Sequence, residues 1–102
     1  MPDFDVVWSD KAERTYNEII EYLNSRWTEK EVHHFIFRTV TVIEKITKNP
    51  FLFKQYKNNP QIRQAVLHET VILIYEVLTD NEKINLLTFW GTRQNPQKLK
   101  LR

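Results

Sequence analysis

The sequence predicts an α+β fold with the element order β-α-α-β-β-β, in which an antiparallel helical hairpin packs on one face of an antiparallel sheet. Two amphipathic stripes at helical spacing fill the first half of the chain, and β-rich segments with short connections fill the second half. The 102 residues include six Phe, four Tyr and three Trp, which can fill one hydrophobic core without disulfides. We therefore expect a single domain over residues 1–102.

The first half is expected to begin with an edge strand at residues 4–8 and to continue into a helix. Ser9 or Asp10 can cap this helix, with Glu13 three residues after Asp10 as the partner of a capping box. Apolar residues then recur at helical spacing. They form one stripe: Ala12, Tyr16, Ile19, Ile20, Leu23 and Trp27.

A second helix is expected directly after the first. Thr28 and Glu31 have the spacing of a capping box and stand where the first stripe ends, and Asn49-Pro50 is a stop signal. The short connection around residues 26–28 makes the two helices antiparallel. The second apolar stripe comprises Val32, Phe35, Ile36, Val40, Ile43 and Ile46.

Three strands are expected in the second half, at residues 62–67, 71–78 and 83–89. The middle segment is apolar on both faces apart from Glu76, as is typical of a central strand. Residues 50–61 are expected to be a long irregular stretch whose aromatic side chains hold it under the helices. His68 and Glu69 fall at the tip of a hairpin, where a solvated turn is the simpler interpretation.

Composition excludes several kinds of chemistry. With one Gly and no Cys the chain cannot build a glycine-rich phosphate loop or a thiolate site, so no cofactor is expected. His33 and His34 are adjacent and would point about 100° apart on a helix, so no metal site is expected either. The start of the chain has neither a basic region nor a long apolar run, which predicts a cytoplasmic protein without a membrane span.

Charge is distributed unevenly along the sequence. Seven basic and nine acidic residues precede Pro50, which gives −2, whereas eight basic and four acidic residues follow it, which gives +4. Four cations near the C-terminus, Arg93, Lys98, Lys100 and Arg102, have no acidic residue among them. Such a segment would attract a phosphate backbone or an acidic protein, although a basic tail can also serve only for solubility.

The order of the motifs resembles the RelE/ParE superfamily of bacterial type II toxins, including those of plasmid-stabilisation systems. The resemblance covers nearly the whole chain and is carried by VVWSDKAE, YNEIIEYL, the NP stop, IRQAVLHETVILIYEV and FWGTRQNP. It implies a growth-inhibiting toxin that a cognate antitoxin neutralises in a hetero-oligomer. RelE-like members cut messenger RNA on the ribosome with a basic cluster and a tyrosine, whereas ParE-like members act against DNA gyrase.

The chain departs from the RNA-cutting members of this superfamily. Arg93 matches their basic residue after the last strand, and Arg63 lies near the expected place of another. However, Ile72 stands where a cutter would carry arginine, and Leu99 where it would carry tyrosine. The resemblance is therefore closer to ParE-like members. If the chain were nevertheless an endoribonuclease, Arg63 and Arg93 would be its catalytic cations, with Tyr56 or His68 as the proton carrier.

The leading hypothesis is thus a toxin without chemistry of its own, which binds a target such as gyrase through Lys54, Lys57, Arg93, Gln94 and Lys98. A ribosome-dependent endoribonuclease and a non-toxic member that keeps only antitoxin binding remain as alternatives. The antitoxin is expected to lay a helix and an extended segment over the hairpin and a sheet edge, with acids at Arg63 and Arg93. Gly91 is expected to permit a turn that directs Arg93 toward the sheet.

Overall fold

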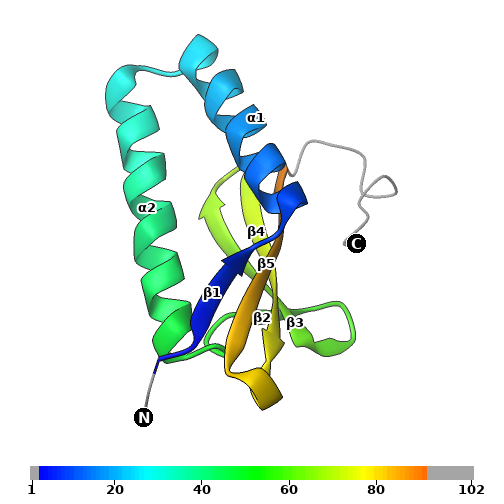
Figure 1. Ribbon diagram of the computed structural model, residues 1–102. Helices are drawn as coiled ribbons and strands as arrows, with labels where there is room; N and C mark the ends of the chain where they lie inside the picture. Colours follow the sequence, from blue (N-terminus) through cyan, green and yellow to red (C-terminus); the bar gives the residue numbers. More distant parts are fainter. Residues whose placement is uncertain (1–2, 92–102) are drawn as a thin grey trace.

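The computed structural model describes residues 3–91. Its elements follow the predicted order, with an additional short strand after the helices and a 3₁₀ turn before the last strand (Figure 1). They are β1 (Asp5–Trp8), α1 (Asp10–Arg26), α2 (Glu29–Lys48), β2 (Lys54–Tyr56), β3 (Asn59–His68), β4 (Val71–Leu78), η1 (Thr79–Asn81) and β5 (Lys83–Gly91).

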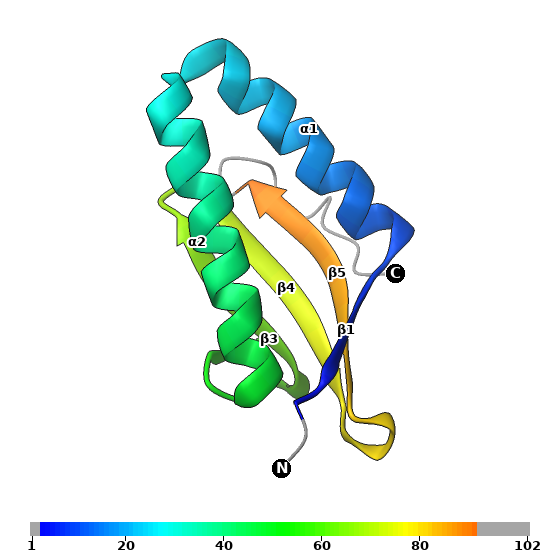
Figure 2. The same cartoon turned by 60° about the vertical axis from the view of Figure 1, so that its left-hand side comes forward.

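The five strands form one sheet in the order β1-β5-β4-β3-β2, and both helices lie across one face of it (Figure 2). The α+β class and the helical hairpin are confirmed, but the sheet is mixed, because β1 runs parallel to β5 from Asp5 beside Lys83 to Trp8 beside Leu86. The remaining pairs are antiparallel. The chain reverses direction four times between β1 and β5, so the two strands must point the same way.

The start of α1 is fixed to the sheet by Ser9. Its Oγ accepts the N–H of Ala12 at 3.0 Å, which caps the helix, and donates to the carbonyl of Leu87 at 3.1 Å. Of the two predicted caps, Ser9 is therefore the one formed, and the pairing of Asp10 with Glu13 is not used. The same hydroxyl that begins the helix also sets its position on β5.

The start of α2 is the predicted capping box. The Glu31 N–H donates to Thr28 Oγ1 at 3.2 Å, and the Thr28 N–H donates to Glu31 Oε1 at 3.3 Å. The predicted apolar stripe of this helix is only partly correct, because Ile36 and Val40 are 37% and 49% exposed. The buried positions instead follow one regular helical row: Val32, Phe35, Thr39, Val42 and Ile46.

Thr39 explains the error in that stripe. A polar residue interrupts the apolar pattern, yet it is 2% exposed because its hydroxyl donates to the Phe35 carbonyl at 2.9 Å. The bond satisfies the hydroxyl within the helix, so Thr39 can face the core at no loss of hydrogen bonding. The row through Ile36 and Val40 is consequently turned away from the sheet.

Residues 50–61 are less irregular than expected. Lys54–Tyr56 forms β2 along the outer side of β3, and β3 already begins at Asn59. Lys57 takes a left-handed φ of 52° and makes the tight turn between these strands. The expected burial of the aromatic residues holds for Phe53, which packs against the main core, whereas Phe51 is exposed.

The main core lies between the hairpin and the sheet and is rich in aromatic contacts. Trp8 stacks on Phe89 with ring centroids 5.3 Å apart, and Tyr16 lies 4.9 Å from the same Phe89 ring. Trp8 and Trp27 are partly buried and pack against this core. A second, smaller cluster on the other face of the sheet contains Ile62, Ile74 and Leu87, with Tyr56, Ile72 and Trp90 packed beside it.

Replacing Thr15 by Val should lower the free energy of unfolding by about 1–2 kcal/mol, because Thr15 Oγ1 accepts the Phe89 N–H of β5 at 3.0 Å and Val leaves that buried donor unpaired. Thr41→Val is the matched control. Its hydroxyl donates only to the Phe37 carbonyl on an exposed surface, so we expect a change within about 0.5 kcal/mol. Urea unfolding measures both values, and equal effects would contradict the role of Thr15.

Candidate functional site

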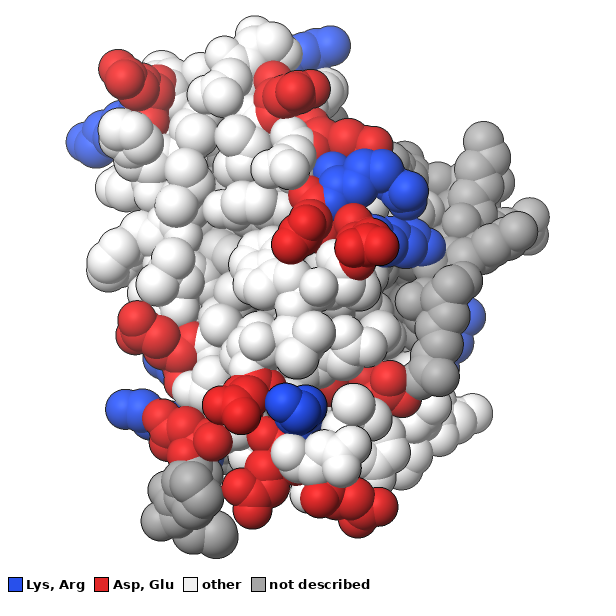
Figure 3. Space-filling model, viewed as in Figure 1, with Lys and Arg blue, Asp and Glu red and all other residues white. Residues whose placement is uncertain are grey.

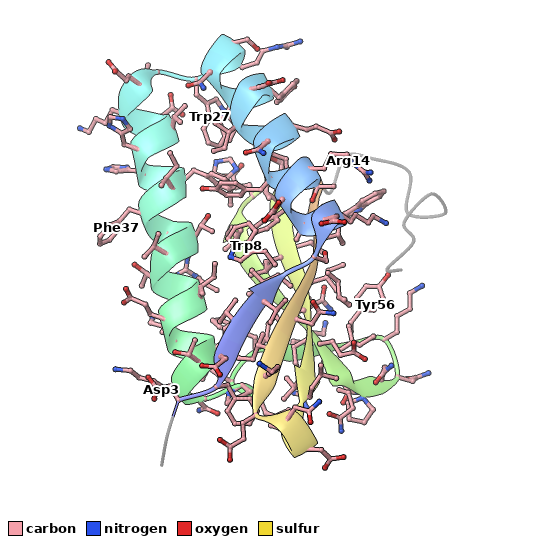
Figure 4. All side chains as sticks on the ribbon, in the orientation of Figure 1. Asp3, Trp8, Arg14, Trp27, Phe37 and Tyr56 are labelled. Carbon is pink, nitrogen blue, oxygen red and sulfur yellow. The ribbon has the colours of Figure 1, made fainter. Side chains whose placement is uncertain are left out.

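The predicted cations of the described region lie at the β2–β3 hairpin, at the end of the sheet away from the junction of the helices. Figure 4 places Tyr56 at this hairpin. Lys54 belongs to β2, Lys57 to the turn and Arg63 to β3. The other predicted site residues, Arg93, Gln94 and Lys98, lie outside residues 3–91, so only this part of the predicted basic surface can be described.

Arg63 is engaged in the hairpin itself. Its Nε donates to the Pro60 carbonyl at 3.0 Å, its Nη1 donates to the Phe53 carbonyl at 3.1 Å, and the guanidinium carbon lies 4.8 Å from the centre of the Phe51 ring. These contacts join the loop before β2 to the turn before β3. The guanidinium therefore acts as a clamp on the local backbone.

Arg63 and Lys54 also lie on different faces of the sheet. Arg63 is opposite Gln55 and Tyr75 in the strand register, whereas Lys54 is opposite Gln64. Side chains of neighbouring residues in a strand alternate between the faces, and directly paired residues share a face. The two cations are thus not gathered at one point.

Ile72 lies on the sheet face that the helices leave uncovered. It is paired with Val66 on β3 and with Trp90 on β5, and Ile74 follows on the same face of β4. The row that crosses the sheet at this position is therefore apolar. No described cation lies in this row, at the position where an RNA-cutting relative would carry arginine.

The two groups considered as proton carriers, Tyr56 and His68, lie far apart on the sheet. Tyr56 pairs with Asn59 at one end of β3 and His68 ends that strand, so about 30 Å separates them at ~3.3 Å per residue. The Nδ1 of His68 accepts the Thr70 N–H at 3.4 Å, and its ring lies 4.3 Å from that of Trp27. His68 is thus the last residue of β3, next to the predicted turn, and its half-buried ring packs against Trp27 instead of standing in solvent.

Tyr75 is the buried phenol nearest to Arg63. Its hydroxyl donates to the Pro50 carbonyl at 2.8 Å, and burial raises its pKa to about 12, against the opposing effect of the Arg63 charge. The group therefore stays protonated at neutral pH. It is a second clamp on the loop at residue 50, and it is unsuited to take up a proton from a substrate.

A cavity of about 310 Å³ opens at the other end of the sheet, between the start of α2 and the end of β3. It is lined by Trp27, Glu31, His34, Phe35, Arg38, Leu67 and His68. A larger groove of about 1060 Å³ continues from Trp27 along α1 to Gly91 at the end of β5. Gly91 ends β5 without a positive φ, and the turn expected between it and Arg93 lies outside the described residues.

The outer surface of α2 is apolar in its middle. Figure 3 shows an uncharged stretch there, between charged side chains near both ends of the helix. Phe37, which points away from the sheet in Figure 4, is 73% exposed. Ile36 and Val40 lie beside it on the helix. Exposed apolar patches of this kind are typical of surfaces that bind another protein.

The sequence of the chain matches that of a known protein family. A family model described as the ParE toxin of the type II toxin-antitoxin system parDE matches residues 6–96. The chain belongs to this family. No sequence among the curated proteins matches it.

Two solved structures resemble this ParE-family chain. A chromosomal ParDE toxin-antitoxin system from P. aeruginosa has a TM-score of 0.70 at 12% sequence identity, over 88% of this chain and 97% of that one. The RelBE2 toxin-antitoxin complex from Mycobacterium tuberculosis has a TM-score of 0.56 at 13% identity, over 87% and 98%. At such identities the likeness concerns the fold.

Two further findings concern membrane-spanning helices and metal sites in this ParE-family chain. None of the helices within residues 3–91 is long and apolar enough to cross a membrane. In the same range, no group of three His, Asp or Glu side chains is arranged to hold a metal ion. His34 lines the small cavity, and His33 is not among its lining residues.

Sequence reasoning missed Arg38 and the exposed part of α2 in this ParE-family chain. Arg38 is the one charged residue between Glu31 and Glu44 in the sequence, and that isolation was the available signal. Phe37 gave a clearer signal, because it falls outside the predicted stripe. A large aromatic residue on the polar side of an amphipathic helix indicates either a second buried face or a contact surface.

The raised pKa of the Tyr75 phenol predicts that the wild type and Tyr75→Phe respond differently to alkaline pH in their melting temperatures. Its folded pKa of about 12 exceeds the ordinary value of 10.0, so the stability it contributes is complete below pH 10 and is lost as pH rises toward 12. Tyr75→Phe should melt a few degrees lower at pH 8, since the Pro50 carbonyl loses its donor. Between pH 10 and 11.5 the melting temperature of the variant should fall less than that of the wild type, and parallel curves would contradict this.

Proposed function

We propose that this ParE-family chain arrests growth by binding a target protein, DNA gyrase, without chemistry of its own. The observation that carries the proposal is the apolar row of Val66, Ile72 and Trp90 on the uncovered sheet face. This row supports a toxin that acts by binding its target, because an RNA-cutting toxin would present an arginine in it. The bonds of Arg63 to the Phe53 and Pro60 carbonyls support the same interpretation.

RNA cleavage by attack of a 2′-hydroxyl makes demands that the described residues meet poorly. A base must take the proton of the hydroxyl, and cations must stabilise the charge that develops on the phosphate. Loss of one such group typically lowers the rate by factors of about 10² to 10³. With Ile72 in place of a cation and Arg63 turned to the loop, several of these factors would apply together.

The target contact is proposed to be electrostatic in part. Lys54 and Lys57 project from the β2–β3 hairpin and are exposed, and the ammonium of Lys57 lies 5.3 Å from the centre of the Tyr56 ring. Arg93, Gln94 and Lys98 would extend this basic surface after β5. Such a surface favours an acidic patch on the target and accelerates association with it.

A supercoiling assay with purified toxin tests the proposal. Micromolar toxin should inhibit gyrase, and replacing both Lys54 and Lys57 by Ala should raise the concentration for half inhibition roughly tenfold. Arg14→Gln is the matched control, because Arg14 is an exposed cation on α1 whose nearest carboxylate, on Glu18, is 3.8 Å away. Gyrase that remains active at micromolar toxin would refute the proposal.

Primer extension on translated message separates the endoribonuclease alternative. A cutter would leave defined 5′ ends during growth arrest, and these ends would vanish in Arg93→Ala. Under our proposal no new ends appear while growth stops. If expression without antitoxin leaves growth unchanged, the chain is instead a non-toxic member that keeps only antitoxin binding.

An antitoxin is the proposed partner of this toxin. The two similar structures are described as toxin-antitoxin systems, and the present chain exposes the kind of surface that a wrapping partner could cover. We expect one apolar contact over Ile36, Phe37 and Val40 and a second contact along an edge of the sheet. Co-purification with the antitoxin should weaken in Phe37→Asp and remain unchanged in Arg14→Gln.

A further inference from the structure

The loop between α2 and β2, residues 49–53, exposes two large apolar side chains side by side. Phe51 is 40% exposed and Leu52 is 51% exposed, whereas Phe53 of the same loop packs against the main core. A single exposed apolar residue is ordinary on a protein surface, but adjacent ones form a patch that can bind a partner. We call Phe51 and Leu52 the loop patch.

Hydrogen bonds hold the loop in place from two sides. The Tyr75 hydroxyl donates to the Pro50 carbonyl at 2.8 Å, and Arg63 Nη1 donates to the Phe53 carbonyl at 3.1 Å. The Arg63 guanidinium also lies over the Phe51 ring, 4.8 Å from its centre. The loop patch is therefore exposed on a fixed backbone. A side chain that is already held in position loses little conformational freedom on binding, so it can contribute more to affinity.

Exposed lysines flank the loop patch. Lys48 stands three residues before the patch and Lys54 two residues after it, so their Cα atoms lie within about 11 Å of it, at most ~3.6 Å per residue. Within the described part of the chain, no carboxylate forms an ion pair with either lysine, although Glu44 lies one turn before Lys48 on α2. No acid occurs in the sequence between Glu44 and Glu69.

The acids at this end of the sheet belong to other strands. Asp5 is on β1 and Asp80 is in η1, which joins β4 to β5, whereas Lys54 is on β2. β1 and β2 are the two outer strands of the five, so about 19 Å separates them at ~4.8 Å per strand. The loop patch is thus an apolar surface with a positive rim.

We propose that Phe51 and Leu52 are the apolar anchor with which the toxin holds its target, a protein surface that offers a hydrophobic pocket with carboxylates at its rim. The inference rests on the proposed function and names the contact that keeps the complex together. A few side chains buried at the centre of an interface carry most of its affinity, whereas charges at the rim mainly accelerate association. Lys48 and Lys54 would face the carboxylates.

The position of the loop patch favours the target over the antitoxin. The proposed antitoxin contact is centred on Phe37, and α2 continues from there for 11 residues to Lys48, about 16 Å at ~1.5 Å per residue. The loop patch follows that end of the helix. The hairpin with Lys54 and Lys57, which is proposed to meet the target, comes directly after the loop. The two proposed contact surfaces are therefore separate.

A nucleic acid is a poorer occupant of the loop patch. Bases bind by stacking on aromatic rings, but one face of the Phe51 ring already lies against the Arg63 guanidinium, and Leu52 offers no ring. A second copy of the chain also fits poorly, because a symmetric contact at this patch would bring Lys48 and Lys54 of both copies together. A protein pocket rimmed by carboxylates satisfies both the apolar side chains and the charge.

Growth arrest by the full-length toxin tests the inference in cells. The double variant Phe51→Ser/Leu52→Ser, expressed without antitoxin, should need at least roughly tenfold more toxin for arrest. Tyr22→Ser is the matched control, because it removes an exposed ring from α1 and should arrest growth like the wild type. Leu52→Asp keeps the Phe51 ring over Arg63 and should also weaken arrest, which separates lost binding from a loosened loop.

Binding kinetics on immobilised gyrase distinguish the anchor from its charged rim. In the double variant the dissociation rate should rise roughly tenfold, with little change in the association rate. Replacing Lys54 and Lys57 by Ala should instead slow association and reduce its dependence on salt. Co-purification of the double variant with the antitoxin should equal that of the wild type, which shows that the variant is folded.

Several results would overturn the inference. One is a double variant that arrests growth and dissociates from gyrase like the wild type. Another is a single-stranded RNA oligonucleotide that binds the wild type and not the double variant, which would assign the loop patch to nucleic acid. A toxin dimer that sediments as a monomer in the double variant would assign the patch to a second copy.

Failure of this inference is distinguishable from failure of the proposed function. Wild-type toxin that arrests growth without inhibiting gyrase would refute gyrase as the target, and weakened arrest in the double variant would still support an anchor on another protein. Equal inhibition of gyrase by the wild type and the double variant would refute only the anchor. A wild-type chain that does not arrest growth would refute both.

Discussion

Replacing Phe35 by Ala should lower the free energy of unfolding by about 3–5 kcal/mol, whereas Phe37→Ala should change it by less than about 0.5 kcal/mol. Phe35 is 3% exposed and lies 6.1 Å from the Tyr16 ring and 6.3 Å from the Trp27 ring. Its removal would leave a cavity between both helices and β3. Phe37 is two positions further along α2, and its ring is exposed to solvent.

Guanidinium unfolding of both variants measures this contrast. A domain of this size has a total stability of roughly 5–15 kcal/mol, so Phe35→Ala should be marginally folded at 37 °C. Phe37→Ala serves as the matched control, because it makes the same chemical change on the same helix. If the two variants lost similar stability, the orientation of α2 on the sheet would be wrong.

The sequence was sufficient to predict those parts of the fold that depend on neighbouring residues. Thr28 and Glu31 formed their capping box because both partners lie within one helical turn. The strand at residues 71–78 was assigned correctly because a run apolar on both faces fits only a strand with neighbours on each side. Local signals of this kind do not depend on the rest of the chain.

The remaining features depend on contacts between distant residues. β2 has three residues and gives no periodic signal, so only its pairing with β3 identifies it. The parallel direction of β1 follows from the number of reversals in the whole chain. On α2, the burial of Thr39 depended on a bond to the Phe35 carbonyl that the apolar pattern does not encode.

The candidate site shows the same division. The place of Ile72 in the motif was enough to show that the chain lacks the arginine of the RNA-cutting members there. Its strand pairs now show an apolar row around it. The role of Arg63 could not be predicted, because its partners are backbone carbonyls of Phe53 and Pro60, which are placed by the path of a loop. Sequence patterns identify the charge of a side chain but not the groups with which that side chain forms hydrogen bonds.

Arg63→Ala should lower the free energy of unfolding by about 2–3 kcal/mol, since it removes two charge-assisted hydrogen bonds and the contact with the Phe51 ring. Arg26→Ala is the matched control. Its guanidinium carbon lies 5.0 Å from the Tyr22 ring, but on an exposed helix surface, so the loss should stay within about 1 kcal/mol. Thermal and urea unfolding give both values.

The same variant distinguishes a structural arginine from one that contacts the target. If Arg63 clamps the hairpin, Arg63→Ala should inhibit gyrase nearly as well as the wild type at a temperature where it is still folded, and should lose inhibition only as it unfolds. We expect this result because a guanidinium held by the Phe53 and Pro60 carbonyls has little capacity left for another partner. An arginine that contacts the target would behave in the opposite way, with unchanged stability and lost inhibition, and that outcome would reject the clamp.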